Sequence, residues 1–180
     1  MREPIRKRWV AGVAACLLLT GFLSAQNARR DPLTAAQVNQ IRDLGGFPNE
    51  RIQLYTKFVD DRAGTIKGLT HRAESQARAH RLENELEEFT ALLDELGSNL
   101  DQYSEEESDI RKALKGLAEA SARWLAILQE LPAEPGFKLA RTEALDGLND
   151  LMSQSKQLLT EQEAYFKAHP KQHGQERANP

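Results

Sequence analysis

Seven large side chains recur between residues 82 and 103 at alternating intervals of four and three residues. They are Leu82, Leu86, Phe89, Leu93, Leu96, Leu100 and Tyr103. A repeat that averages 3.5 residues places all seven on one side of a helix, as in helices that pack side by side at a shallow angle. The Asp and Glu residues between them then lie on the solvated side, because a helix with one buried stripe must expose polar groups elsewhere.

The rest of the chain favours helices as well. After residue 25 it holds 21 Leu against 7 Val plus Ile, and Leu favours helices whereas β-branched residues favour strands. Further helical stripes are Ile52, Tyr55, Phe58, Val59, Ile66 and Leu69; Ile110, Leu114, Leu117, Trp124, Leu128 and Leu131; and Leu145, Leu148, Met152, Leu159 and Phe166. The sequence therefore predicts an all-α fold, an antiparallel bundle of three or four long helices preceded by a short one.

Several local signals mark where these helices begin and end. Thr34 and Gln37 match a capping box, with Leu33 and Val38 as its hydrophobic staple, and Gly45-Gly46-Phe47-Pro48 ends that short helix. A second start is expected at Asn49, a loop at residues 131–137, and a helix end at residues 169–170. Between 97 and 108 the alternatives stay open: a break at Gly97-Ser98, a capping box at residues 104–107, or one unbroken helix.

The first 25 residues match a secretory signal peptide. A basic head, Arg2 to Arg8, precedes an apolar stretch from Trp9 to Leu23, and Ala25 precedes the expected cleavage site. An uncleaved anchor is the alternative, although about 20 apolar residues are needed to span a bilayer. Cys16, the only cysteine, follows a lipoprotein-like Val-Ala-Ala, but the apolar core continues past it, so we expect ordinary cleavage near Ala25.

The expected mature chain has no cysteine and a formal net charge of −6, from 20 Lys and Arg against 26 Asp and Glu. That balance argues against nucleic acid or anionic lipid as the main partner. Its length suits a single domain. We expect a short linker over residues 26–32, a helical bundle domain over 33–169, and a disordered tail over 170–180, which is polar and contains prolines.

The sequence carries no recognisable reaction chemistry. It has no Cys-x-x-Cys-His, no Gly-rich phosphate loop, no Gly-x-Ser-x-Gly and no His-Glu-x-x-His. None of the four histidines has the Glu-x-x-His spacing that di-iron bundles use; they are His71, His80, His169 and His173. We therefore predict no catalytic residue, no cofactor and no metal ligand, and we expect Trp124 to be a core residue. Glu107 is the one acid on a seam that we expect to be buried.

Charge is unevenly distributed along the chain. Eleven acids and no Lys or Arg lie between Leu82 and Ile110, whereas residues 51–81 carry seven bases and three acids, and Arg111, Lys112 and Lys115 follow. We interpret this as pairing between neighbouring helices of opposite sign, which fixes their register. A metal-binding face on the acidic helix, residues 83–109, is the alternative.

Two resemblances add expectations. "LTAAQ", Leu33 to Gln37, resembles the Leu-Thr-x-x-Gln motif of the Spy/CpxP-like periplasmic chaperones, small exported all-α proteins that bind unfolded clients on an apolar cradle; here the motif occurs once. More of the chain resembles a group of uncharacterised exported helical proteins of bacteria, through "DPLTAAQVNQIRDL", "PNERIQLYTKF", "NLDQYSEEESDIRKALK" and "LARTEAL". That resemblance implies a shared helical fold and export, and carries no activity.

Together these observations predict an exported, non-enzymatic helical-bundle protein with a structural or protein-interaction role in the cell envelope, periplasmic or secreted. The alternatives are a Spy-like chaperone and a metal-binding protein. A protein partner is expected, no nucleic acid, and membrane contact only through an uncleaved signal peptide. Self-association is left open.

Overall fold

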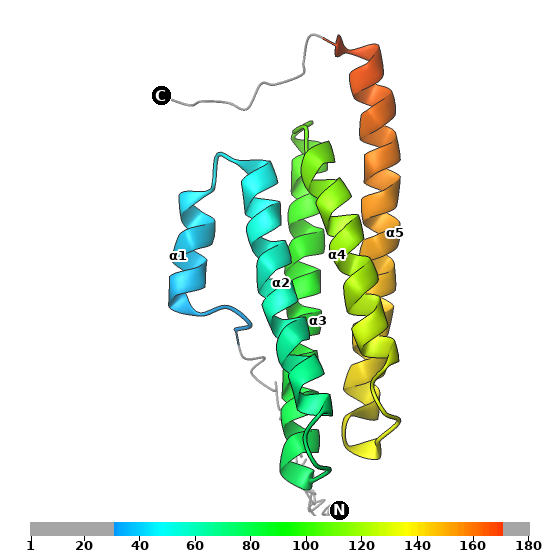
Figure 1. Ribbon diagram of the computed structural model, residues 1–180. Helices are drawn as coiled ribbons and strands as arrows, with labels where there is room; N and C mark the ends of the chain where they lie inside the picture. The colour runs from blue at the N-terminus through cyan, green and yellow to red at the C-terminus, as the bar shows by residue number, and fades with distance from the viewer. Residues whose placement is uncertain (1–30, 171–180) are drawn as a thin grey trace, which may run out of the picture.

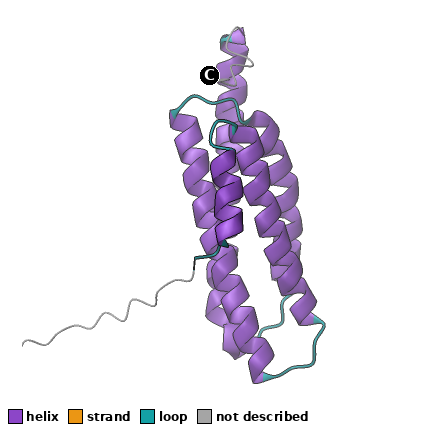
Figure 2. Cartoon of the chain, turned by 90° about the vertical axis from the view of Figure 1, so that its left-hand side faces the viewer, coloured by secondary structure: helices purple, strands orange, loops and turns teal. Residues whose placement is uncertain are grey.

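The computed structural model describes residues 31–170, and all regular structure within this range is helical (Figure 2), which confirms the all-α prediction. The elements are α1 (Ala35–Asp43), α2 (Pro48–Thr70), α3 (Gln76–Glu105), α4 (Arg111–Gln129), the 3-10 turn η1 (Pro135–Phe137) and α5 (Lys138–Ala168). The predicted signal peptide, most of the predicted linker and residues 171–180 of the predicted tail lie outside the described residues. None of the described helices combines the length and apolar character that a membrane span requires.

The short first helix begins as its sequence predicts. The Thr34 hydroxyl accepts a hydrogen bond from the Gln37 backbone N–H, and the Gln37 side chain accepts from the Thr34 backbone N–H, which completes the capping box. The helix ends before Gly45, and α2 starts at Pro48, one residue earlier than expected. Proline suits this first position because its missing N–H has no partner there in any helix.

The four long helices α2, α3, α4 and α5 form a bundle in which consecutive helices run in opposite directions (Figure 1). Around the bundle the order is α2, α3, α5, α4, because α2 packs against α3 and α4, and α5 packs against the same two helices. The connection from α3 to α4 therefore crosses the bundle end between opposite corners. As a consequence α2 and α4 run parallel to each other as neighbours, and so do α3 and α5. Helix α1 lies outside the bundle, against α2.

The predicted seams form the core. All seven residues of the 82–103 ladder are buried, as are the stripes predicted on α2 and along α4, and they belong to one hydrophobic cluster. Trp124 is fully buried, and its ring meets the Phe89 ring edge to face across the bundle, with the centroids 6.1 Å apart. Opposite corners of the bundle are thus joined through side chains at its centre.

The predicted stripe on α5 is partly wrong. Leu145, Met152 and Leu159 are only half-buried at its edge. The buried stripe is Ala140, Ala144, Leu148, Leu151, Ser155, Leu158, Gln162 and Phe166. The prediction was based on large apolar side chains, whereas several core positions of α5 hold small or polar residues. The large apolar residues chosen instead lie at the edge of the buried stripe.

The structure also decides where the central region turns. Gly97 lies inside α3, so a break there is wrong, and so is one unbroken helix. Helix α3 ends at Glu105 and α4 begins at Arg111, and the predicted capping box at 104–107 does not form because Ser104 belongs to the last turn of α3. A further turn over residues 71–75 separates α2 from α3, and the sequence reading missed it. Ser75 caps α3 by accepting from the Arg78 N–H.

Candidate functional site

A surface groove lies between the parallel helices α2 and α4. It encloses about 410 Å³, and its lining residues are Asp60, Ala63, Gly64, Lys67, Arg123, Ala126, Ile127 and Glu130. Three of the lining residues, Ala63, Gly64 and Ala126, are small, and a Cβ at Gly64 would meet no atom within 4 Å. We call this feature the α2–α4 groove. Sequence reasoning missed it, because small side chains on an exposed helix face give no periodic apolar signal.

One end of the α2–α4 groove is fixed to the core. The Trp124 indole N–H donates to the Asp60 carboxylate, and Arg123 donates to the same carboxylate with its Nη2 atom 3.0 Å from Oδ2. Because Trp124 is fully buried, this hydrogen bond ties a rim residue of α2 to the centre of the bundle through α4. The wall of the groove at this end is therefore anchored to the core.

The other end of the groove carries Lys67 and Glu130. Lys67 follows Asp60 by seven residues on α2, and Glu130, the C-cap residue of α4, follows Arg123 by seven residues. Seven residues are close to two helical turns and rise about 10.5 Å, so each pair lies on one face of its helix. Since α2 and α4 are parallel, Lys67 and Glu130 lie at similar heights. The corner charges of the groove, Asp60, Arg123, Lys67 and Glu130, thus alternate in sign around it.

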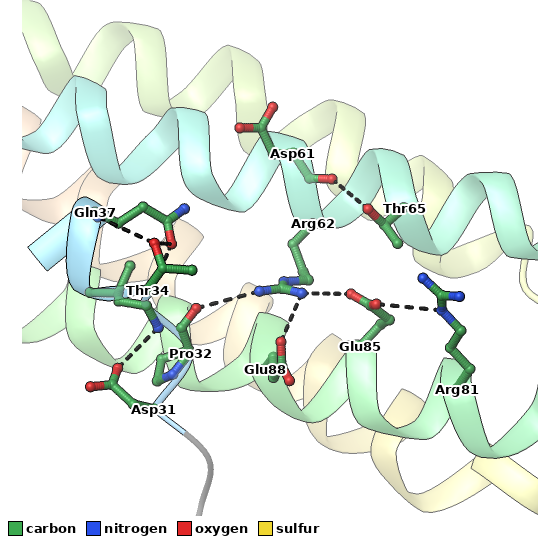
Figure 3. A network of polar contacts seen from close by, with 11 residues as sticks. Asp31, Pro32, Thr34, Gln37, Asp61, Arg62, Thr65, Arg81, Glu85 and Glu88 are labelled. Carbon is green, nitrogen blue, oxygen red and sulfur yellow. Dashed lines mark hydrogen bonds and ion pairs between the residues drawn. The ribbon is translucent and has the colours of Figure 1, made fainter.

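A second polar cluster joins the segment before α1 to α2 and α3 on another side of the bundle (Figure 3). The Arg62 Nη1 atom lies 2.8 Å from Glu85 Oε2 and 2.7 Å from Glu88 Oε2, and its Nη2 donates to the Pro32 carbonyl at 3.4 Å. A base of α2 therefore holds two acids of α3, which confirms the predicted pairing for residues 51–81. The same arginine fastens the segment before α1 to the bundle. The pairing predicted for the bases that follow residue 110 is wrong, because α4 does not pack against α3, and Lys115 of α4 lies 3.2 Å from Glu163 of α5 instead.

Two buried tyrosines lie between α2 and α3, near the bundle end at which α2 begins and α3 ends. Tyr55 donates its hydroxyl proton to Glu95 Oε1 at 3.0 Å. Burial raises the pKa of Tyr55, and the negative charge of Glu95 raises it further, while Arg51 opposes the shift. Burial also raises the pKa of Tyr103, again opposed by Arg51. Both hydroxyls stay protonated at neutral pH, and that of Tyr55 serves as a hydrogen-bond donor between the two helices.

Two buried side-chain amides hold the α3–α4 connection in place. Asn49 donates to the Asp109 carbonyl at 2.7 Å and accepts from the Ala113 N–H at 3.0 Å. Gln162 accepts from the Ile110 N–H at 3.1 Å and donates to the Ser108 carbonyl at 2.8 Å. The first turn of α4 is thus capped from α2 and α5 instead of by its own N-cap residue. Sequence reading missed both amides, since their partners lie more than 50 residues away.

The histidines do not come together. His71 is exposed at the end of α2, and His80 is exposed on α3 with its Nδ1 atom 3.2 Å from Glu83 Oε2. His169 follows the last turn of α5, with its ring tilted against Tyr165 at a centroid distance of 4.5 Å. His173 lies outside the described residues. The three described histidines therefore occupy three separate places on the surface.

The acids of residues 83–109 are dispersed as well. Glu85 and Glu88 face Arg62, Glu95 accepts from Tyr55, and Asp101 accepts from Gln154 at 2.6 Å. Over residues 31–170 no three His, Cys, Asp or Glu side chains are grouped as a metal ion would require. The expectation that Glu107 is buried is wrong: it is exposed in the turn after α3 and accepts from the Tyr165 hydroxyl.

Exposed apolar side chains are sparse on the described surface. Its large exposed hydrophobic residues are Phe47, 45% exposed, and Leu139, 72% exposed. Phe47 precedes α2 and Leu139 lies in the first turn of α5, so they lie at opposite ends of the bundle (Figure 1). The most exposed large apolar side chains of residues 31–170 are therefore far apart.

Comparison of the chain with models of known families, with curated proteins and with solved structures gives no match. The two resemblances drawn from the sequence therefore remain predictions.

Proposed function

We propose that this is an exported, non-enzymatic helical-bundle protein with a structural or protein-interaction role in the cell envelope, and that it acts through its surface. The observation that carries the proposal is the α2–α4 groove: an open hollow with small side chains at its centre, charges at its corners, and a wall fixed to the core through Trp124 and Asp60. Such a hollow accommodates the side chains of another protein without rearrangement of the bundle.

The distribution of apolar residues supports the same proposal. All four long helices contribute large apolar side chains to one cluster, in which Trp124 and Phe89 fill the centre. Burial of this kind stabilises the bundle and makes it a rigid support for surface contacts. Two of the buried polar side chains, Asn49 and Gln162, hold the start of α4 in place.

An envelope pull-down tests the interaction role. The chain from Gln26 onward, tagged at its C-terminus, is expected to capture a specific partner from an envelope extract. Ala126→Glu, which places a long charged side chain in the groove, is expected to abolish capture. Ala164→Glu is the matched control, because Ala164 is an exposed residue of α5 outside the groove lining. Equal capture by both variants would remove the groove from the proposal.

The envelope location is supported by the order of basic head, apolar stretch and small residues over residues 1–25. Cell fractionation and N-terminal sequencing test it. We expect the protein outside the cytoplasm, beginning near Gln26. A cytoplasmic protein that retains Trp9 would contradict the proposed export.

A further inference from the structure

We propose that the occupant of the α2–α4 groove is a second copy of this chain, docked by a twofold axis so that α2 and α4 of one copy run antiparallel to those of the other. The inference rests on the proposed function, since it names the protein that this interaction surface receives. It is carried by the alternating corner charges, Asp60, Arg123, Lys67 and Glu130.

A twofold interface places the same patch of both copies face to face, so the patch must be complementary to itself. At one end of the groove, Asp60 lies on α2 and Arg123 on α4, and they are paired. At the other end the signs are reversed, with Lys67 on α2 and Glu130 at the C-cap of α4. Each helix therefore presents one acid and one base, two turns apart, and the two helices present them in opposite order.

A twofold axis in the plane of this face, perpendicular to the helices, turns the second copy end for end. Lys67 of each copy then faces Asp60 of the other, and Glu130 of each faces Arg123 of the other. Every corner meets the opposite charge, and the Asp60–Arg123 pairs within each copy can stay in place. The arrangement extends two existing ion pairs into one network across the interface.

An axis parallel to the helices would also bring opposite charges together, pairing Lys67 with Glu130. It would however set all four helices in the same direction and align their dipoles. The perpendicular axis opposes those dipoles, which is the more favourable arrangement. With the parallel axis, Asp60 of one copy would face Arg123 of the other and compete for the pair that each copy already holds. The perpendicular axis avoids this competition.

The centre of the face permits close approach. Ala63, Gly64 and Ala126 have small side chains, and Ile127 supplies an apolar side chain between the corners. Exposed ion pairs add only about 0–1 kcal/mol each, so the corner charges determine orientation more than affinity. We therefore expect a reversible dimer that forms with rising concentration and weakens with added salt.

Sedimentation equilibrium of the chain from Gln26 onward tests the proposal. Lys67→Glu places like charges at two corners of the pair and is expected to weaken dimerisation by about tenfold or more. Lys112→Glu makes the same charge change at an exposed α4 residue outside the groove, and is expected to leave the dimer unchanged. A chain that stays monomeric at all accessible concentrations, or equal effects of both variants, would overturn the proposal.

Two charge exchanges decide the orientation, with helix content and melting checked by circular dichroism. Arg123→Glu with Glu130→Arg keeps opposite charges in contact in the antiparallel pair and is expected to dimerise. Lys67→Glu with Glu130→Lys brings like charges together in that pair and is expected not to. The opposite outcome would overturn the antiparallel arrangement.

The two proposals can fail separately. If the chain is monomeric and the envelope pull-down still captures a partner that Ala126→Glu excludes, self-association is wrong and the interaction role stands. If the dimer forms as described and no other protein is captured, self-association stands and the protein's partner in the envelope is itself.

Discussion

Asp60 connects the buried centre of the bundle to its surface groove through a single carboxylate. We predict that Asp60→Ala lowers the free energy of unfolding by about 1–3 kcal/mol, because the buried Trp124 N–H loses its acceptor. Asp60→Asn keeps an acceptor oxygen and should cost less. Urea unfolding measures both, and Asp61→Ala, at the exposed neighbouring position, should change little. Equal losses at residues 60 and 61 would contradict the role given to this hydrogen bond.

The buried tyrosines make stability depend on pH in the alkaline range. The pKa values of Tyr55 and Tyr103 are raised in the folded chain, chiefly by burial. Above about pH 10 the unfolded chain therefore loses these protons first, and ionisation favours unfolding. We predict that the two tyrosines contribute fully to the free energy of unfolding below that pH. Their contribution should decline as the pH rises from there toward the pKa values of the folded chain. Urea unfolding across this range should show a shallower decline in Tyr55→Phe, and an unchanged slope would contradict the assignment.

At the scale of the elements, the turn between α3 and α4 carries local strain. Glu107 has a φ of 54°, in the left-handed region that side chains other than glycine rarely adopt. Glu107→Gly should raise the free energy of unfolding by about 1 kcal/mol, because glycine accepts this conformation without a steric cost. Glu106→Gly is the matched control, since its φ of −78° is ordinary and glycine should destabilise there. A gain in both variants would point to a different cause.

The start of α4 depends on a side chain from another helix. Gln162→Leu removes one acceptor and one donor from the backbone groups of Ile110 and Ser108. We predict a loss of about 2–4 kcal/mol in urea unfolding, because each buried backbone group left unpaired costs roughly 1–3 kcal/mol. Gln157→Leu, at an exposed position of α5, should change stability little. A small loss in Gln162→Leu would show that α4 is capped well enough without it.

At the scale of the whole molecule, the stripes on α2, α3 and α4 could be predicted from sequence because large side chains mark them at regular spacing. Leu82 and Trp124 are buried as their positions indicated. The order of the helices around the bundle could not be predicted from sequence, because each leucine-rich stripe could pack against any of the other helices. That order depends on the diagonal α3–α4 connection and on the long-range bonds of Asn49 and Gln162. The α2–α4 groove could not be predicted either, because it is an empty space beside small residues, and these give no periodic signal in the sequence.

The single core leads to a prediction about how the whole chain unfolds. Trp124 is the only tryptophan after residue 25, so fluorescence of the chain from Gln26 onward reports the centre of the bundle, whereas far-ultraviolet circular dichroism reports all helices. Because one cluster joins all four long helices, both signals should follow one urea transition. Leu86→Ala, in the fully buried ladder of α3, should shift both by the same free energy, about 2–5 kcal/mol. If fluorescence changes first while helicity persists, the bundle does not unfold as one unit, and the rigid support proposed for the α2–α4 groove fails with it.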